Sequence, residues 1–221
     1  MKKKRRSLTA KAKILLIVLL IPVSVVLFTL TAIIWTSIRH PDVIQKSAST
    51  LMDLHERHGG LTIPDEYIPI YKEAAEEYNI PWTLLAAHHR VETRFSTMKT
   101  MVSPTGAEGH MQFMPCTFVG WGYPGCTDLG KGNIPEDDKT NPDVIEKYGG
   151  YGVDGNGDGI ADPYNLEDAI YSAANYLAQS GAADGQIEKA IFHYNHSDKY
   201  VEDVLWFFEE YEAQQTQQAQ K

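Results

Sequence analysis

Apolar and polar positions alternate with the period of a helix along several stretches of the chain. Prolines suited to a first helical turn, and glycine or serine residues suited to helix ends, bound these stretches. A short helix is also expected after Pro115. Residues 97–163, rich in Gly, Pro, Asn and Asp, are expected to form ordered loops, and the Gln-rich tail from Ala213 to fray. The pattern predicts longer helices over residues 41–60, 69–78, 81–94, 166–179, 186–194 and 198–212.

A run of 22 residues without a charge, residues 14–35, is long enough to cross a bilayer as a helix. Five basic residues at positions 2–6 precede it, and the positive-inside rule places such a cluster in the cytoplasm. A cleaved signal peptide is the alternative, but its apolar region is usually about 7–15 residues long and ends in a small-residue cleavage site. Both alternatives export residues 41–221. The sequence predicts a basic cytoplasmic tail (1–13), an uncleaved signal anchor (14–35), a stalk (36–62), a catalytic domain (63–212) and a flexible tail (213–221).

The charge of the chain is unevenly divided. Residues 1–40 hold eight of the 20 Lys and Arg residues and no acid, so residues 41–221 carry 12 basic and 29 acidic residues, a net charge of −17. Phosphate binding needs a basic face, which excludes nucleic acid as an expected partner. The absence of long strand patterns predicts a mainly α fold, a single helical domain with long ordered loops.

One carboxylate lies on an apolar helical face. Glu92 shares a stripe, at spacings of three and four residues, with Leu85 and His88. Burial disfavours the charged form of a carboxyl group, so the pKa of Glu92 should rise, and a protonated Glu can donate its proton to a glycosidic oxygen. The alternative is a buried Glu paired with Arg90, Arg94 or a histidine.

Two cysteines, Cys116 and Cys126, are the only ones in the chain. In an exported domain they could form a disulfide that closes a short glycine-containing loop. Two buried free thiols are the alternative, and nothing in the sequence indicates a catalytic cysteine.

Three motifs resemble the signature of the soluble-lytic-transglycosylase family of the lysozyme-like superfamily. They are Glu92, the segment 106–115 with the pattern Gly-Ala-x-Gly-x-Met-Gln-x-x-Pro, and a Tyr-Asn pair at 194–195. The resemblance covers residues 68–211. One departure is Thr93, which follows the Glu where the family often has Ser. Glu108 occupies the variable position of the second motif and is expected to be exposed.

The resemblance implies an α+β lysozyme-like domain that cleaves the glycan strands of peptidoglycan. Glu92 would be the only acid/base, acting on the bond from N-acetylmuramic acid to N-acetylglucosamine and leaving 1,6-anhydro ends without water. Ser103, Gln112 and Met114 would line the sugar cleft, Tyr194 would lie beside Glu92, and Asn195 would hold the substrate or the loop. Together with the predicted anchor, this implies a single-pass protein of the bacterial cytoplasmic membrane with its N-terminus inside and its catalytic domain outside. No organic cofactor and no particular protein partner is implied.

Oxygen-bearing side chains recur at every second position from Asp154 to Asp162, as in an EF-hand loop, but position twelve is Asn165 in place of Glu. This loop and the run from Asp168 to Tyr176 resemble the calcium loop of membrane-bound lytic transglycosylase B. The resemblance implies a structural Ca²⁺. A turn without metal is the alternative. The implied ligands are Asp154, Asn156, Asp158, the Ile160 carbonyl and Asp168.

Three other functions compete with lytic transglycosylation. A hydrolytic muramidase of the same fold would use a water in place of the sugar hydroxyl. Zinc catalysis is suggested by His88 and Glu92 at a metal-ligand spacing, but no His-Glu-x-x-His motif exists. A non-catalytic wall-binding component of an envelope-spanning apparatus would have no need of an intact Glu92.

Overall fold

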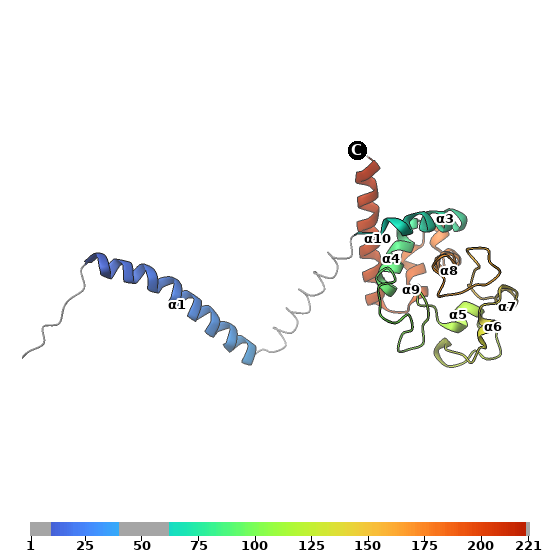
Figure 1. The fold of residues 1–221 in the computed structure, drawn as a ribbon, viewed down its shortest axis with the longest axis horizontal. Helices are drawn as coiled ribbons and strands as arrows, with labels where there is room; N and C mark the ends of the chain where they lie inside the picture. The colour runs from blue at the N-terminus through green and yellow to red at the C-terminus, as the bar shows by residue number, and fades with distance from the viewer. Residues whose placement is uncertain (1–9, 40–61, 220–221) are drawn as a thin grey trace, which may run out of the picture. The chain divides into compact units, whose positions relative to one another are not determined.

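The computed structural model describes residues 10–39 and 62–219, which fall into two units, residues 1–56 and 57–221. In the first unit, α1 (Ala10–Arg39) is a helix of 30 residues that includes the predicted anchor segment (Figure 1). Within the portion of the chain that is described, no helix is both long and apolar enough to span a membrane. The helix predicted over residues 41–60 lies outside the described residues.

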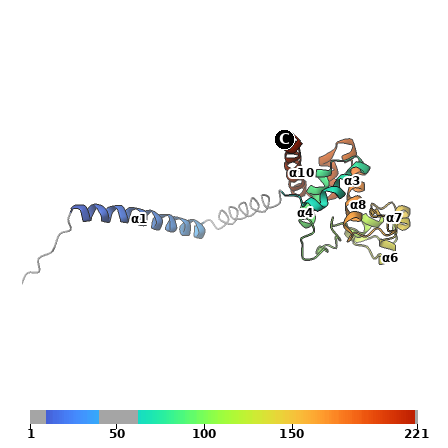
Figure 2. The same ribbon diagram turned by 45° about the horizontal axis from the view of Figure 1, so that its top comes forward.

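The second unit contains every helix predicted between residues 69 and 212. Proline stands just before or within the first turn of the first three, as expected from its fixed φ angle. Figures 1 and 2 show these helices gathered in one body. They are α3 (Ile68–Tyr78), α4 (Trp82–Thr93), α5 (Pro115–Val119), α8 (Leu166–Gln179), α9 (Ile187–Tyr194) and α10 (Asp198–Ala219).

The structure differs from the sequence prediction at two places. Within the predicted loops, α6 (Glu136–Lys139) and α7 (Pro142–Tyr148) form, the latter capped by Asn141, whose side chain accepts hydrogen bonds from two backbone N–H groups. The predicted end of the last helix at residue 212 is wrong, because α10 continues to Ala219. Residues 213–219 hold only Ala, Gln and Thr, and neither Gly nor Pro interrupts the helix.

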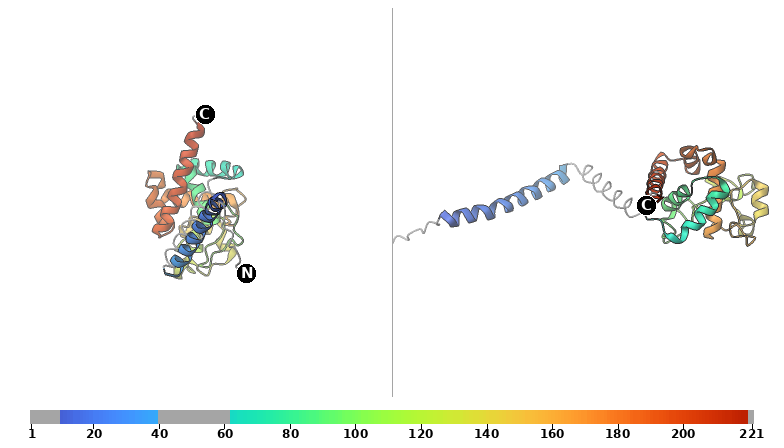
Figure 3. Two further views of the ribbon diagram at one scale, coloured as in Figure 1. Left: turned by 90° about the vertical axis from the view of Figure 1, so that its left-hand side faces the viewer. Right: turned by 90° about the horizontal axis from the view of Figure 1, so that it is seen from above.

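The mainly α class is confirmed. The described residues contain no strand, only single bridges that join Glu108 to Val102 and to Phe113. The central helix is α4, which packs against α3, α8 and α10. Figure 3 shows α10 running beside α4. Leu84 and Leu85 on α4 are fully buried, so the position of this helix is fixed on several sides by apolar burial.

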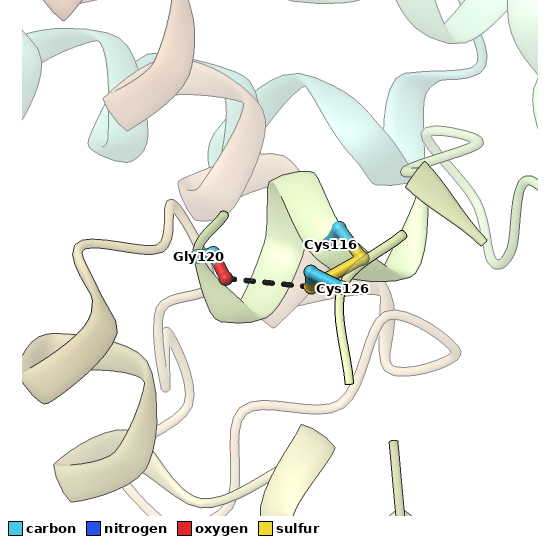
Figure 4. Close-up of a disulfide and its surroundings, with 3 residues drawn as sticks. All are labelled: Cys116, Gly120 and Cys126. Carbon is cyan, nitrogen blue, oxygen red and sulfur yellow. Dashed lines mark hydrogen bonds between the residues drawn. A yellow bond between two sulfur atoms is a disulfide. The ribbon is translucent and has the colours of Figure 1, made fainter. Parts of the chain in front are cut away.

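A disulfide joins Cys116, in α5, to Cys126, with their Cα atoms 5.5 Å apart (Figure 4). The dashed line in Figure 4 marks the 3.5 Å approach of the Cys126 sulfur to the carbonyl oxygen of Gly120. A disulfide sulfur carries no proton, so this approach is a packing contact. The bridge closes the loop that follows α5.

Candidate active site

Glu92 lies in the last turn of α4, the central helix of the second unit. The helix ends at once after it, since Arg94 is left-handed with φ 53° and its N–H donates to the carbonyl of Arg90. The side chain of Glu92 is half-buried. Its carboxyl group is therefore held on a rigid helix, at the edge of the core.

Burial dominates the electrostatics of Glu92 and raises its pKa to about 8. A hydrogen bond of 2.5 Å from the Tyr200 hydroxyl to Glu92 Oε1 has the opposite effect and lowers this pKa, but less than burial raises it. No other charge among the described residues contributes to this shift. The guanidinium of Arg90 lies over the ring of Phe207 on α10. The expected rise in the pKa of Glu92 is thus present.

Two tyrosines and a histidine form the wall behind this carboxyl group. The rings of Tyr194 and Tyr200 are parallel, with centroids 6.4 Å apart, and His88 packs edge-on against Tyr194 at 5.0 Å. Burial lowers the pKa of His88 to about 4, so its ring is neutral at pH 7. Its Nδ1 donates to the carbonyl of Leu84. Burial and, after it, the charge of Glu92 raise the pKa of both tyrosines well above its ordinary value, so both hydroxyl groups lie close to the Glu92 carboxyl group.

Two side-chain hydrogen bonds hold the motif at 106–115 beside Glu92. The Tyr194 hydroxyl donates to the carbonyl of Met111 at 2.8 Å, and Thr93 Oγ1 donates to the carbonyl of His110 at 2.8 Å. The hydroxyl that follows the Glu therefore binds the motif, and Thr meets this need as Ser would. Gly109 has φ 76°, and a Cβ there would collide with the carbonyl of Pro163.

The expectation that Glu108 is exposed is wrong. Its carboxylate accepts a 2.6 Å hydrogen bond from the buried ammonium of Lys139 in α6. Although burial opposes the charge, the bonds to Glu108 and Glu136 raise the pKa of Lys139. This ion pair attaches the motif to α6, and it could not be predicted from the sequence because α6 was not predicted.

The predicted cleft residues do not all present free side chains. Ser103 Oγ accepts from the backbone N–H of Ala107, and Gln112 Nε2 donates to the carbonyls of Met101 and Gly109. Both side chains therefore shape the motif loop. Met114 is half-buried just before α5, and Asn195 is exposed at the end of α9. Of the predicted site residues, Tyr194 is the one most directly connected with Glu92. Its ring stacks against that of Tyr200, which binds Glu92, and its hydroxyl donates to the motif.

The predicted metal loop adopts tight turns. Asp154 accepts from the N–H groups of Gly157, Asp158 and Gly159. Asp168, in the first turn of α8, accepts from the N–H groups of Gly155, Asn156 and Asp162 in the loop. Burial raises the pKa of Asp168 even though these N–H groups oppose it. The donors match calcium in type, being carboxylates and amides. Among the described residues, however, no three His, Cys, Asp or Glu side chains converge as a metal site.

Comparison with known proteins gives one family match. Residues 144–188 match the family model described as the Transglycosylase SLT domain. This segment resembles the transglycosylase SLT family. It runs from α7 to the start of α9 and includes the loop at 154–168, whereas Glu92 and the motif at 106–115 lie outside it. The expected resemblance to lytic transglycosylases is confirmed by a segment separate from the three motifs that predicted it.

A curated relative of this chain is the L-Ala--D-Glu endopeptidase of Bacillus subtilis (strain 168). The two are 33% identical over 79 residues, which cover 36% of this chain and 24% of the relative. The chain thus matches about a quarter of the relative's length. No solved structure matches the chain significantly.

Tyr200, whose hydroxyl is the hydrogen-bond donor to Glu92, was not among the predicted site residues. The two residues are 108 positions apart, on α4 and α10, so no local spacing connects them. A signal was nevertheless present, since Tyr200 lies six residues after Tyr194, in the first turn of α10, and its N–H donates to Ser197 Oγ.

Proposed function

We propose that this chain is a peptidoglycan lytic transglycosylase in which Glu92 is the only acid/base. The observation that carries the proposal is the state of Glu92: a half-buried carboxyl group whose pKa is about 8. At pH 7 such a group holds a proton, which a general acid must have before it meets its substrate. The SLT family match supports glycan-cleaving chemistry in general.

The hydrogen bond from Tyr200 decides which oxygen of Glu92 carries the proton. Because the Tyr200 hydroxyl donates to Oε1, the proton is held by Oε2. In the proposed reaction, Oε2–H protonates the glycosidic oxygen as the bond to C1 of the muramic acid breaks. The N-acetyl group of that sugar helps to stabilise the positive charge at C1. Glu92 next removes the proton of the C6 hydroxyl, O6 bonds to C1, and the anhydro ring closes.

A mechanism with one carboxylate suits the surroundings of Glu92. Glycosidases with two carboxylates hold them about 5–9.5 Å apart. A second acid at that range would raise the pKa of Glu92 by its charge, yet no acidic residue among those described contributes to the shift. In the proposed mechanism the substrate supplies the second group. Hydrolysis by a water in place of the C6 hydroxyl is the alternative outcome at the same Glu92.

Mass spectrometry of the products tests this proposal. Purified peptidoglycan is digested with the full-length chain, and the released muropeptides are weighed. Lytic transglycosylation predicts anhydro ends, lighter by one water than the reducing ends that a muramidase leaves. Glu92→Gln should abolish release, whereas Glu146→Gln, at an exposed site on α7, should not. Equal release by Glu92→Gln would contradict the proposal, and cleavage within stem peptides would indicate a different activity.

We further propose, from the sequence pattern at 154–168, that this loop binds Ca²⁺ as a structural ion. Its support is the alternation of carboxylate and amide oxygens with Gly at the turn, where Gly159 has φ 90°. The ligands would be Asp154, Asn156, Asp158, Ile160 and Asp168. Calcium should raise the melting temperature of the full-length chain. Asp158→Asn should remove this response, whereas Asp184→Asn, exposed and outside the loop, should keep it. An equal melting temperature with and without Ca²⁺ would contradict the proposal.

A further inference from the structure

A continuous chain of hydrogen-bonded groups runs from α3 to Tyr164 in the 154–168 loop. Tyr71 OH bonds to His89 Nδ1 (2.6 Å), and His89 Nε2 bonds to Ser96 Oγ (2.7 Å). Ser96 Oγ also bonds to His110 Nδ1 (2.6 Å), and His110 Nε2 bonds to the carbonyl of Tyr164 (2.9 Å). The links join α3, α4, the turn after α4 and the motif at 106–115. We call these five residues the Tyr71–Tyr164 chain.

The carbonyl of Tyr164, at one end of the Tyr71–Tyr164 chain, determines which group donates in each of its hydrogen bonds. A carbonyl can only accept, so His110 must carry its proton on Nε2, and its Nδ1 must accept from Ser96. The Ser96 oxygen then accepts from His89 Nε2–H, and His89 Nδ1 accepts from the Tyr71 hydroxyl. Burial lowers the pKa of His89 to about 3 and also lowers that of His110, so both rings are neutral. With neutral rings, only this one order of protons satisfies all four bonds.

Ser96 stands in a strained backbone. Arg94, Phe95 and Ser96 have φ values of 53°, 57° and 63°, three successive left-handed residues of which none is glycine. Each such residue carries a steric cost, and such conformations persist only when their surroundings hold them. The N–H of Ser96 donates to Thr93 Oγ1, and its hydroxyl is held between two histidines.

The strained turn connects Glu92 with the motif. Thr93, adjacent to Glu92, donates to the carbonyl of His110, while Ser96 donates to the ring of the same His110. His110 is thus held by its backbone and by its ring, and both bonds come from residues just after Glu92. On its far side the next residue, Met111, accepts from Tyr194. The distance between Glu92 and the motif is set by these bonds.

We propose that Ser96 and His110 are positioning residues, which hold Glu92 and the Gly-Ala-x-Gly-x-Met-Gln motif in their productive relative arrangement through the proton-ordered Tyr71–Tyr164 chain. The proposal rests on the function proposed for Glu92. Neither residue needs to touch the glycan. Loss of the chain should lower kcat and leave KM nearly unchanged, because a misplacement of about 1 Å can cost a factor of about 100 in rate.

Two substitutions at Ser96 separate positioning from backbone strain. Ser96→Ala removes the hydroxyl and keeps the strained φ, while Ser96→Gly removes the hydroxyl and relieves the strain. We expect kcat to fall about tenfold or more in both, with the melting temperature of Ser96→Gly at or above that of Ser96→Ala. Thr216→Ala removes an exposed hydroxyl on α10 and should retain the kcat of the wild type. Wild-type kcat in both Ser96 variants would overturn the proposal.

Nitrogen-15 NMR of the imidazole rings gives a readout besides activity. In the full-length chain at pH 7, His89 and His110 should both be neutral with the proton on Nε2, and Ser96→Ala should shift both sets of signals. An imidazolium or an Nδ1–H tautomer at either ring would overturn the proton order. A Glu92→Gln variant that keeps activity would instead contradict the proposed function, and the tautomers would then still test the chain independently.

Discussion

At the scale of a residue, two effects act in opposition on Glu92. Removal from water raises the pKa of its carboxyl group, and the hydrogen bond from Tyr200 lowers it, with burial the larger effect. The result, about 8, lets the group hold a proton at neutral pH and release it when the leaving oxygen needs one. The same hydrogen bond orients the group, so Tyr200 affects both its acidity and its geometry.

Substitution of Tyr200 by Phe separates these contributions. Without the donated bond, the ionised form of Glu92 loses a stabilising partner, and a hydrogen bond to a charged group contributes about 1.5–3 kcal/mol, or about one to two pH units. We expect the alkaline limb of kcat/KM to move upward by about that amount, with a lower maximal rate because Glu92 is less well oriented. The pH–rate profile of the variant measures both. A limb that moves downward would contradict this account.

At the scale of an element, local signals such as helix caps predict most of the helices. The side-chain partners that join one helix to another depend on contacts between residues distant in sequence. The start of α4 after Pro81 and the apolar stripe that includes Glu92 were visible in the sequence. The cap at Asn141 and Pro142 is an equally local signal for α7, but it lies in a segment whose Gly, Pro, Asn and Asp content predicts loops. Tyr200 and the Tyr71–Tyr164 chain could not be predicted, because their partners lie on helices or loops that are distant in sequence.

Gly109 provides a test of how the motif packs on the loop that ends at Pro163. Gly109 and Gly185 share a φ of 76°, but a Cβ at 109 would strike the carbonyl of Pro163, whereas a Cβ at 185 would meet nothing within 4 Å. Gly185→Ala should therefore cost only the backbone strain, about 1 kcal/mol. Gly109→Ala should cost several times more, as measured by denaturant unfolding. Equal losses of stability would show that the close approach at 109 has no energetic consequence.

At the scale of the whole molecule, the proton on Glu92 makes stability depend on pH. The folded pKa of about 8 exceeds the ordinary 4.5, so the stabilisation by this proton is complete below pH 4.5 and is lost as pH rises through 8. Glu92→Gln removes this dependence. We expect the free energy of unfolding of the variant, relative to the wild type, to increase from pH 5 to pH 8 by on the order of 1–3 kcal/mol.

Glu146→Gln is the matched control for this comparison, since its side chain is exposed on α7. Its stability relative to the wild type should stay constant over the same pH range. A constant difference for Glu92→Gln as well would mean that Glu92 is ionised in the folded protein at neutral pH.

The location of the chain stays a prediction of the sequence. The basic tail and the uncharged run at 14–35 predict a domain held outside the cytoplasmic membrane, where its substrate would be. Residues 41–221 carry a net charge of −17, so anionic wall polymers would repel this part of the chain and not attract it. Protease treatment of intact protoplasts should remove the second unit, and its full protection would contradict an extracytoplasmic location.

The most direct test is a carbon-13 NMR titration of the Glu92 carboxyl group in the full-length chain, assigned by the loss of its signal in Glu92→Gln. We expect a midpoint near pH 8, and hence a protonated Glu92 at neutral pH. A midpoint near the ordinary value of 4.5 would show a carboxylate with no proton to donate, and this would contradict the proposed acid/base role.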